Sequence, residues 1–138
     1  MASASTPAAA QNPALVATPS HAWWQHLFSA IDARDSAGFV ALLTPDAHFR
    51  FGNGPTVIGC EAIGAAVSGF FSAIASCRHR LIRSWSTPTG VACEGEVTYG
   101  RLDGSTITVP FANVLDLQGD LVCSYRIYID NSPLFSGP

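Results

Sequence analysis

The chain has 138 residues, of which 48% are apolar and 12% are charged, and these values predict one well-packed domain. All seven basic residues are arginines without a basic run, and the net charge is −3, which argues against a nucleic-acid-binding surface. No apolar run approaches the roughly 20 residues of a membrane span, and the start has no signal-peptide pattern, so we expect a cytoplasmic protein.

Residues 1–20 are nearly uncharged, low in complexity and contain three prolines. Such a segment buries too little apolar surface to offset the entropy of ordering it. We therefore predict a flexible tail over residues 1–20, followed by a single domain over residues 21–138.

Helical patterns dominate the first half of the domain. Apolar residues recur at three- and four-residue spacing over 21–33 and again over 60–76, which predicts two helices. A short helix is expected over about 36–43, where Pro45 follows, and a strand over 47–51 ("AHFRF") leads into the turn "GNGP".

The second half of the domain changes to a period of two, with strands predicted at 78–86, 91–102, 105–117 and 121–130. The separating segments "TPTG", "DG" and "QGD" are typical of hairpin turns. Helices followed by a strand meander predict an α+β domain, in which three N-terminal helices pack on one face of a curved antiparallel sheet.

The lengths of these turns predict which residues share a face of the sheet. With loops of four, two and three residues, successive rows of one face contain Arg83, Glu94, Asn113, Tyr125; Leu81, Glu96, Phe111, Ile127; and His79, Thr98, Val109, Ile129. We assign this face to the core, because it is the more apolar one in the last two strands.

On this register the two carboxylates of "CEGEV" would face inward and differ in role. Glu94 would form a buried ion pair with Arg83. Glu96 would lie between Leu81 and Phe111, where desolvation suits a general acid or base. The alternative is that both glutamates are solvated on the outer face.

A second candidate for acid–base chemistry is His79, although the histidine could equally be a surface residue between two arginines. Asn113 could donate to a developing oxyanion or complete a polar network with Tyr125. Seven side chains are candidates to shape a substrate pocket or to fill the core: Trp23, Leu27, Phe49, Phe51, Phe111, Tyr125 and Ile127.

The four cysteines, Cys60, Cys77, Cys93 and Cys123, are widely spaced. They form no C-x-x-C pair, and no histidine lies at zinc-finger spacing. We therefore expect free thiols and predict neither a metal site nor a cofactor.

The order of these elements, with "AIDARD", "LLTPDAHFRFGNGPTVIGCEAI" and the terminal "YRIYID", resembles the nuclear transport factor 2-like superfamily over roughly residues 22–132, in its SnoaL-like branch. That branch includes proteins similar to ketosteroid isomerases and limonene epoxide hydrolases. The resemblance implies a cone-shaped fold, usually dimeric, whose concave sheet and helices enclose an apolar pocket.

Carried over by position, the resemblance implies different site residues for each branch. The catalytic Arg and Asp of the epoxide hydrolases fall on Glu94 and Glu96. The second oxyanion-site Asp of the isomerases falls on Asn113, and the Asp and His of dehydratase-like members fall on Asp32 and His79.

These observations favour a small cofactor-independent enzyme that performs acid–base chemistry on an apolar cyclic, terpenoid-like or polyketide-like molecule. The isomerase, epoxide hydrolase, cyclase and dehydratase types all stay open. The alternative is a non-catalytic ligand-binding or dimerisation module of the same fold.

We expect a homodimer through the outer sheet face, because the register places apolar residues there: Val97, Tyr99, Pro110, Ala112 and Tyr128.

Overall fold

The computed structural model of the protein describes residues 21–135. The predicted tail over residues 1–20 and the last three residues, 136–138, lie outside the described residues. Within the described part, no helix has the length and apolar character that crossing a membrane requires.

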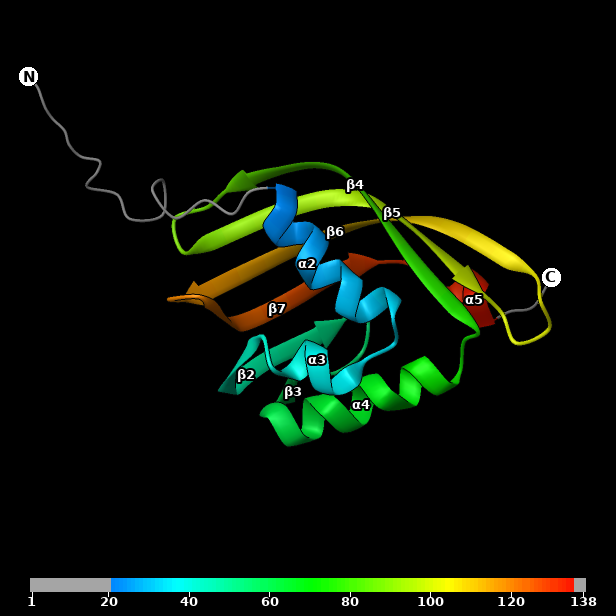
Figure 1. The fold of residues 1–138 in the computed structure, drawn as a ribbon, viewed down its shortest axis with the longest axis horizontal. Coiled ribbons are helices and arrows are strands. Elements are labelled where there is room, and N and C mark those ends of the chain that lie inside the picture. Colours follow the sequence, from blue (N-terminus) through cyan, green and yellow to red (C-terminus); the bar gives the residue numbers. More distant parts are fainter. Residues whose placement is uncertain (1–20, 136–138) are drawn as a thin grey trace, which may run out of the picture.

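The chain forms helices first and a strand meander afterwards, as the change of sequence period predicts (Figure 1). The elements in chain order are α2 (His21–Asp32), α3 (Ser36–Val40), β2 (Leu43–Phe51), β3 (Val57–Ile58), α4 (Cys60–Ser72), β4 (Ser76–Ser86), β5 (Gly90–Gly100), β6 (Thr106–Gln118), β7 (Leu121–Ile129) and α5 (Ser132–Phe135). The strand β3 and the helix α5 were not predicted, because each has too few residues to show a period.

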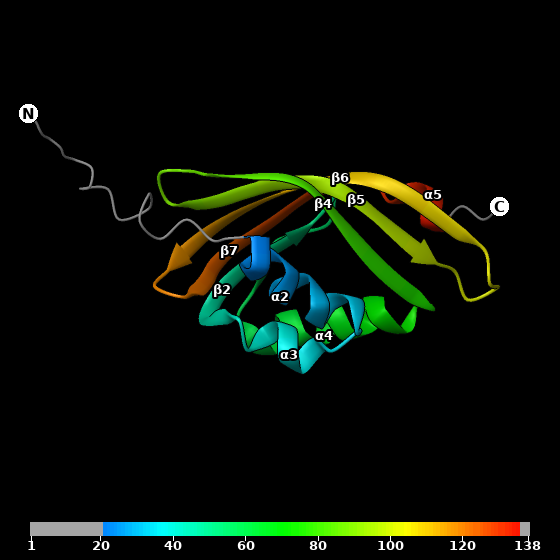
Figure 2. The same cartoon turned by 45° about the horizontal axis from the view of Figure 1, so that its top comes forward.

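The strands form one open six-stranded sheet in the order β3-β2-β7-β6-β5-β4. The meander β4 to β7 is antiparallel throughout, and β2 joins it beside β7 in parallel. The sheet curves over α2, α3 and α4, which lie together against its concave face (Figure 2). The predicted α+β class is thus confirmed, with a mixed rather than a purely antiparallel sheet.

The end of α2 is fixed by its backbone. The N–H of Asp35 donates to the carbonyl of Ala30 at 2.9 Å, and the N–H of Arg34 donates to the carbonyl of Ile31 at 2.9 Å. These two bonds close a Schellman motif, in which Arg34 has the left-handed φ of 55° that glycine usually supplies. The Arg34 guanidinium also donates to the carbonyl of Ile74 at 3.2 Å, which ties this corner to the segment before β4.

The register of the sheet differs from the prediction at two of the three hairpins, whereas the four-residue loop between β4 and β5 pairs Ser86 with Val91 as predicted. Between β5 and β6 the loop has three residues rather than two, because the N–H of Arg101 donates to the carbonyl of Ser105 and Gly104 has a φ of 92°. Between β6 and β7 the turn has two residues, and Gln118 pairs with Leu121. One residue of difference exchanges the two faces of β5, so the predicted rows are wrong there. Between β6 and β7 a further register shift next to Asp116 brings the total to two residues, so Asn113 and Tyr125 still share the inner face as predicted.

A β-bulge at Ile82 also shifts the register between β4 and β5 away from the prediction. Beyond it Arg83 pairs with Glu94, as predicted, but before it His79 pairs with Val97 rather than with Thr98. The extra residue therefore lets β4 direct His79 to the inner face and Arg83 to the outer face.

Candidate functional site

An apolar cavity of about 320 Å³ lies between the concave face of the sheet and the helices. Its walls come from every strand of the sheet and from α2, α3 and α4. Most of the lining is aliphatic or aromatic, and polar side-chain atoms enter it from five residues: Cys77, His79, Tyr99, Asn113 and Tyr125. A concave apolar pocket with a few placed polar groups is typical of a small-molecule site.

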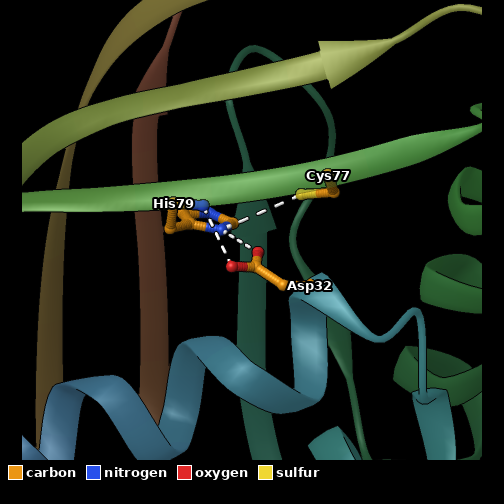
Figure 3. Close-up of side chains that lie close together, drawn as sticks. All are labelled: Asp32, Cys77 and His79. Carbon is orange, nitrogen blue, oxygen red and sulfur yellow. Dashed lines mark hydrogen bonds and ion pairs between the residues drawn. The ribbon is translucent and has the colours of Figure 1, made fainter.

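His79, which lines the cavity, forms a close pair with Asp32 (Figure 3). The Nδ1 atom of His79 lies 2.6 Å from Oδ1 of Asp32, and the backbone N–H of His79 donates to Oδ2 at 3.0 Å. A carboxylate oxygen accepts, so the imidazole carries a proton on Nδ1 and has its lone pair on Nε2. The pair therefore has the orientation of a carboxylate-held general base.

Aromatic rings fix the plane of the His79 imidazole. The ring of Phe28 stacks on it at a centroid distance of 4.6 Å and an angle of 5°, and the edge of Phe111 meets it at 5.3 Å. The imidazole side chain is only 10% exposed. An imidazole that is packed on a ring face and bonded through Nδ1 has little rotational freedom, so its Nε2 atom keeps one direction.

Local backbone structure brings the two partners together. Asp32 is the last residue of α2, where the Schellman motif ends the helix, and His79 lies in the first part of β4. The two residues are separated by 47 positions in the chain. The Asp32 and His79 positions implied by the family resemblance are therefore adjacent in the structure.

Cys77 lies beside this pair and was not predicted as a site residue. Its Sγ atom is 3.8 Å from Nδ1 of His79, and it belongs to the cavity lining. The signal was present in the sequence, because residues two apart on a strand share a face. Burial raises the pKa of the Cys77 thiol, and the nearby Asp32 carboxylate raises it further, so this thiol is not an activated nucleophile.

Asn113 and Tyr125 form a second polar group in the cavity wall. The Nδ2 atom of Asn113 donates to the Tyr125 hydroxyl at 3.5 Å, and Asn113 is 2% exposed. Among the described residues the buried Oδ1 atom of Asn113 has no hydrogen-bond partner. Burial raises the pKa of Tyr125, so its hydroxyl stays protonated and can donate. The group thus offers a donor and an acceptor to a ligand.

The predicted pocket residues divide in two. Five of the seven line the cavity: Phe49, Phe51, Phe111, Tyr125 and Ile127. The other two do not, because Leu27 is fully buried in the core and Trp23 packs against the core beside Trp24. The helical spacing of these two residues predicts burial but does not distinguish the cavity wall from the core behind it.

The inward orientation predicted for the two glutamates is wrong. Glu94 and Glu96 lie on the outer face with side chains 41% and 43% exposed. Glu94 pairs with Arg83 at 2.6 Å, as predicted, but this ion pair is exposed rather than buried. Glu96 pairs with Arg80 at 2.7 Å, and its neighbours across the strands are not Leu81 and Phe111. The cause is the three-residue β5–β6 loop, which moves both carboxylates away from the cavity.

Because several thiols and phenols are buried, we expect the protein to lose stability at alkaline pH. Burial raises the pKa values of Cys77, Tyr99 and Tyr125, and raises that of Cys93 to about 12. These groups ionise more easily in the unfolded chain, so their contribution is complete below about pH 9 and decreases as the pH rises from there. The free energy of unfolding, measured by urea titration from about pH 8 to about pH 11, should fall by about 1.4 kcal/mol per pH unit for each group that ionises only on unfolding.

Substituting one of the buried thiols provides the control for the pH titration. The Cys93→Ala variant should show a smaller pH slope than the wild-type chain, whatever its absolute stability, because one raised pKa is removed. A free energy of unfolding that does not change with pH over this range would contradict the burial of these groups.

The chain matches the family model of the SnoaL-like domain over residues 24–125. Among proteins of curated function, none matches the chain.

Several solved structures share the fold. A protein with a ketosteroid isomerase-like fold from Catenulispora acidiphila, in complex with trimethylamine, has a TM-score of 0.76 at 17% identity, covering 86% of this chain and 92% of that one. TerC, co-crystallised with polyporic acid, has a TM-score of 0.71 at 16% identity, covering 83% and 94%. A protein described as a polyketide cyclase from a Silicibacter species has a TM-score of 0.66 at 20% identity, covering 83% and 91%. At these identities the likeness shows the fold.

Proposed function

The chain belongs to the SnoaL-like domain family, and on this premise we propose that it is a small enzyme that performs acid–base chemistry on an apolar cyclic molecule. The contact of His79, which lines the cavity, with the Asp32 carboxylate is the observation that carries this proposal. His79 would abstract a proton through Nε2, and Asp32 would hold the tautomer and stabilise the imidazolium that forms.

Asn113 and Tyr125 supply the second requirement of such a reaction, a group that polarises a substrate oxygen. Removing a proton next to a carbonyl places negative charge on that oxygen, and a protonated phenol in a dry wall stabilises the charge. The unpartnered Oδ1 atom of Asn113 would accept from a substrate hydroxyl. A ligand with a carbonyl or a hydroxyl at this end would therefore be bound in one orientation.

The distance between the two polar groups limits the substrate. His79 pairs with Val97, and Asn113 with Cys93, so the two residues are four positions and two strands apart. At about 3.3 Å per residue and about 4.8 Å per strand, their backbones lie roughly 16 Å apart across the sheet. A ligand that contacts both groups must therefore span the space between their side chains.

The size of the cavity agrees with a small ring system. Its volume of about 320 Å³ is at the lower end of the roughly 300–1,000 Å³ that is usual for ligand sites. The structural neighbours that were solved with polyporic acid and trimethylamine support a small-molecule ligand for this fold. Isomerisation, cyclisation and dehydration all need a base and an oxygen-polarising group, so we propose this set of reactions.

A substrate screen tests the proposal. The chain should be incubated with cyclic enones, hydroxylated rings and epoxides, while ligand binding is followed by thermal shift and turnover by mass spectrometry. We expect a cyclic enone or a hydroxylated ring to bind and to exchange or lose a proton. Compounds that bind without any exchange or turnover would favour a second function, a binding module, which the largely apolar cavity walls also support.

We also propose that the protein is a homodimer through the outer face of the sheet. The predicted register places Val97 and Tyr99 on this face, but both residues are buried in the core. Apolar groups nevertheless remain on the outer face, where Ala112 pairs with Tyr128 and Trp85 pairs with Ala92. Tyr128 and Trp85 are 58% and 46% exposed, which is costly for two large rings unless a partner covers them.

Light scattering should give about twice the chain mass of 14.5 kDa at micromolar concentration. Because a charge at position 128 opposes burial of this part of the face, Tyr128→Glu should give the mass of one chain. A wild-type monomer would contradict this association.

A further inference from the structure

Three different metal-ligating side chains form a cluster, two of which line the cavity. The ligand atoms of Asp32, Cys77 and His79 all lie within 4.8 Å of one another and point toward one another (Figure 3). We propose that these three residues bind a thiophilic divalent cation of the zinc class. The proposal shares two residues with the proposed acid–base function but does not rest on it. Binding the cation through Nδ1 releases the proton of the Cys77 thiol and moves the imidazole proton from Nδ1 to Nε2, so the metal-bound chain does not use His79 as a base.

Two of the three distances between the ligand atoms are within about 1 Å of those of a tetrahedral site. With metal bonds of about 2.0–2.3 Å, a tetrahedron has a nitrogen–oxygen edge of about 3.4 Å and a nitrogen–sulfur edge of about 3.6 Å. The edges in the structure are 2.6 Å from Nδ1 to Oδ1 and 3.8 Å from Nδ1 to Sγ. An opening of less than about 1 Å at the Asp32 carboxylate, through rotation of that side chain, accommodates the ion.

The surroundings hold the ligands in place for this geometry. Oδ2 of Asp32 accepts from the backbone N–H of His79 at 3.0 Å, which orients the carboxylate while Oδ1 faces the cluster. Phe28 fixes the imidazole plane, and Cys77 and His79 are both on β4, two residues apart. Ligands held by a second layer of contacts lose little entropy when an ion binds.

The ligand set selects the kind of cation. A thiolate and a carboxylate together carry two negative charges, which balance one divalent ion next to a neutral imidazole. Sulfur and imidazole nitrogen favour Zn²⁺ and Co²⁺, whereas Mg²⁺ and Ca²⁺ require mainly oxygen ligands, of which the cluster supplies one. Cys77 and His79 line the cavity, so a fourth coordination position on that side of the ion would be available to water or to a ligand oxygen.

Cobalt substitution tests the site without any substrate. Titration of the folded chain with Co²⁺ should produce the thiolate-to-cobalt charge-transfer absorption in the near ultraviolet and the intense visible bands of tetrahedral cobalt. Zn²⁺ should abolish both sets of bands by displacement, and Mg²⁺ should not. Because no turnover is measured, the outcome is independent of whether the acid–base proposal holds.

Matched variants assign the ligands. Cys77→Ala should lose the charge-transfer band, whereas Cys123→Ala, which removes a partly exposed thiol outside the cluster, should keep it. Asp32→Asn should retain the band while weakening cobalt binding by at least about 10-fold. If Cys77→Ala does not fold, His79→Gln serves instead, with the visible bands lost. A wild-type chain without the bands, or a band that persists in Cys77→Ala, would overturn the proposal.

Discussion

Replacing Asp32 with asparagine should lower turnover on any substrate found by about 10²- to 10⁴-fold while leaving the chain folded. The amide keeps the size of the carboxylate but removes its charge, so the proton on Nδ1 of His79 is no longer specified and the imidazolium is no longer stabilised. His79→Gln should cause a loss at least as large, because it removes the base itself. The rates should be measured under single-turnover conditions, where product release does not hide the chemical step.

The control for this experiment is the pair of glutamates on the outer face. Glu96→Gln and Glu94→Gln should leave the turnover unchanged, because both carboxylates lie on the face of the sheet that is turned away from the cavity. Full activity in Asp32→Asn together with a large loss in Glu96→Gln would reverse the assignment of the site. The double variant Asp32→Asn/His79→Gln should be no slower than His79→Gln alone, since the two residues act as one unit.

The Phe28→Ala variant should have a free energy of unfolding lower by about 3–5 kcal/mol, the largest stability effect expected from one substitution near the site. Phe28 is 3% exposed and joins three parts of the core: its ring stacks on Trp24 at 5.7 Å, on His79 at 4.6 Å, and meets the edge of Phe111 at 5.8 Å. Removing the ring leaves a cavity that these rigid neighbours cannot close.

Urea unfolding at neutral pH measures this loss, and Leu102→Ala is the matched control. Leu102 is 70% exposed in the β5–β6 loop, so its truncation should stay within about 0.5 kcal/mol. Phe28→Leu should lie between the two, because leucine fills part of the space. A loss below about 1 kcal/mol in Phe28→Ala would mean that the helix α2 does not pack on the sheet as described.

The order of the helices and strands could be predicted from the sequence, because each long element shows a hydrophobic period that extends over many residues. The apolar spacing of α2 and the alternation from β4 to β7 are each long enough to outweigh local exceptions. The parallel pairing of β2 with β7 was not predictable in this way, because it joins strands more than 70 residues apart and no turn connects them.

The faces of the strands depend on single residues and were therefore harder to predict. The dipeptide "DG" is compatible with a two-residue turn and with the end of a three-residue loop. The side chain of Asp103 stabilises the three-residue loop, because it accepts from the N–H of Ser105 at 2.9 Å. Because this loop has one residue more than predicted, Val97 rather than Glu96 lies on the inner face. His79 and Asp32 were found because their positions came from the family pattern, which did not use this register.

The bulge at Ile82 has a further consequence for how the molecule meets its neighbours in solution. An open sheet has two rims with unpaired backbone groups, which invite other chains to add strands and begin aggregation. At one rim β3 has only two residues, too few to act as a template. At the other rim β4 is long, but the bulge interrupts its hydrogen-bonding row and arginines flank it at positions 78, 80 and 83. Both rims are therefore protected from strand addition, and self-association is left to the broad face of the sheet.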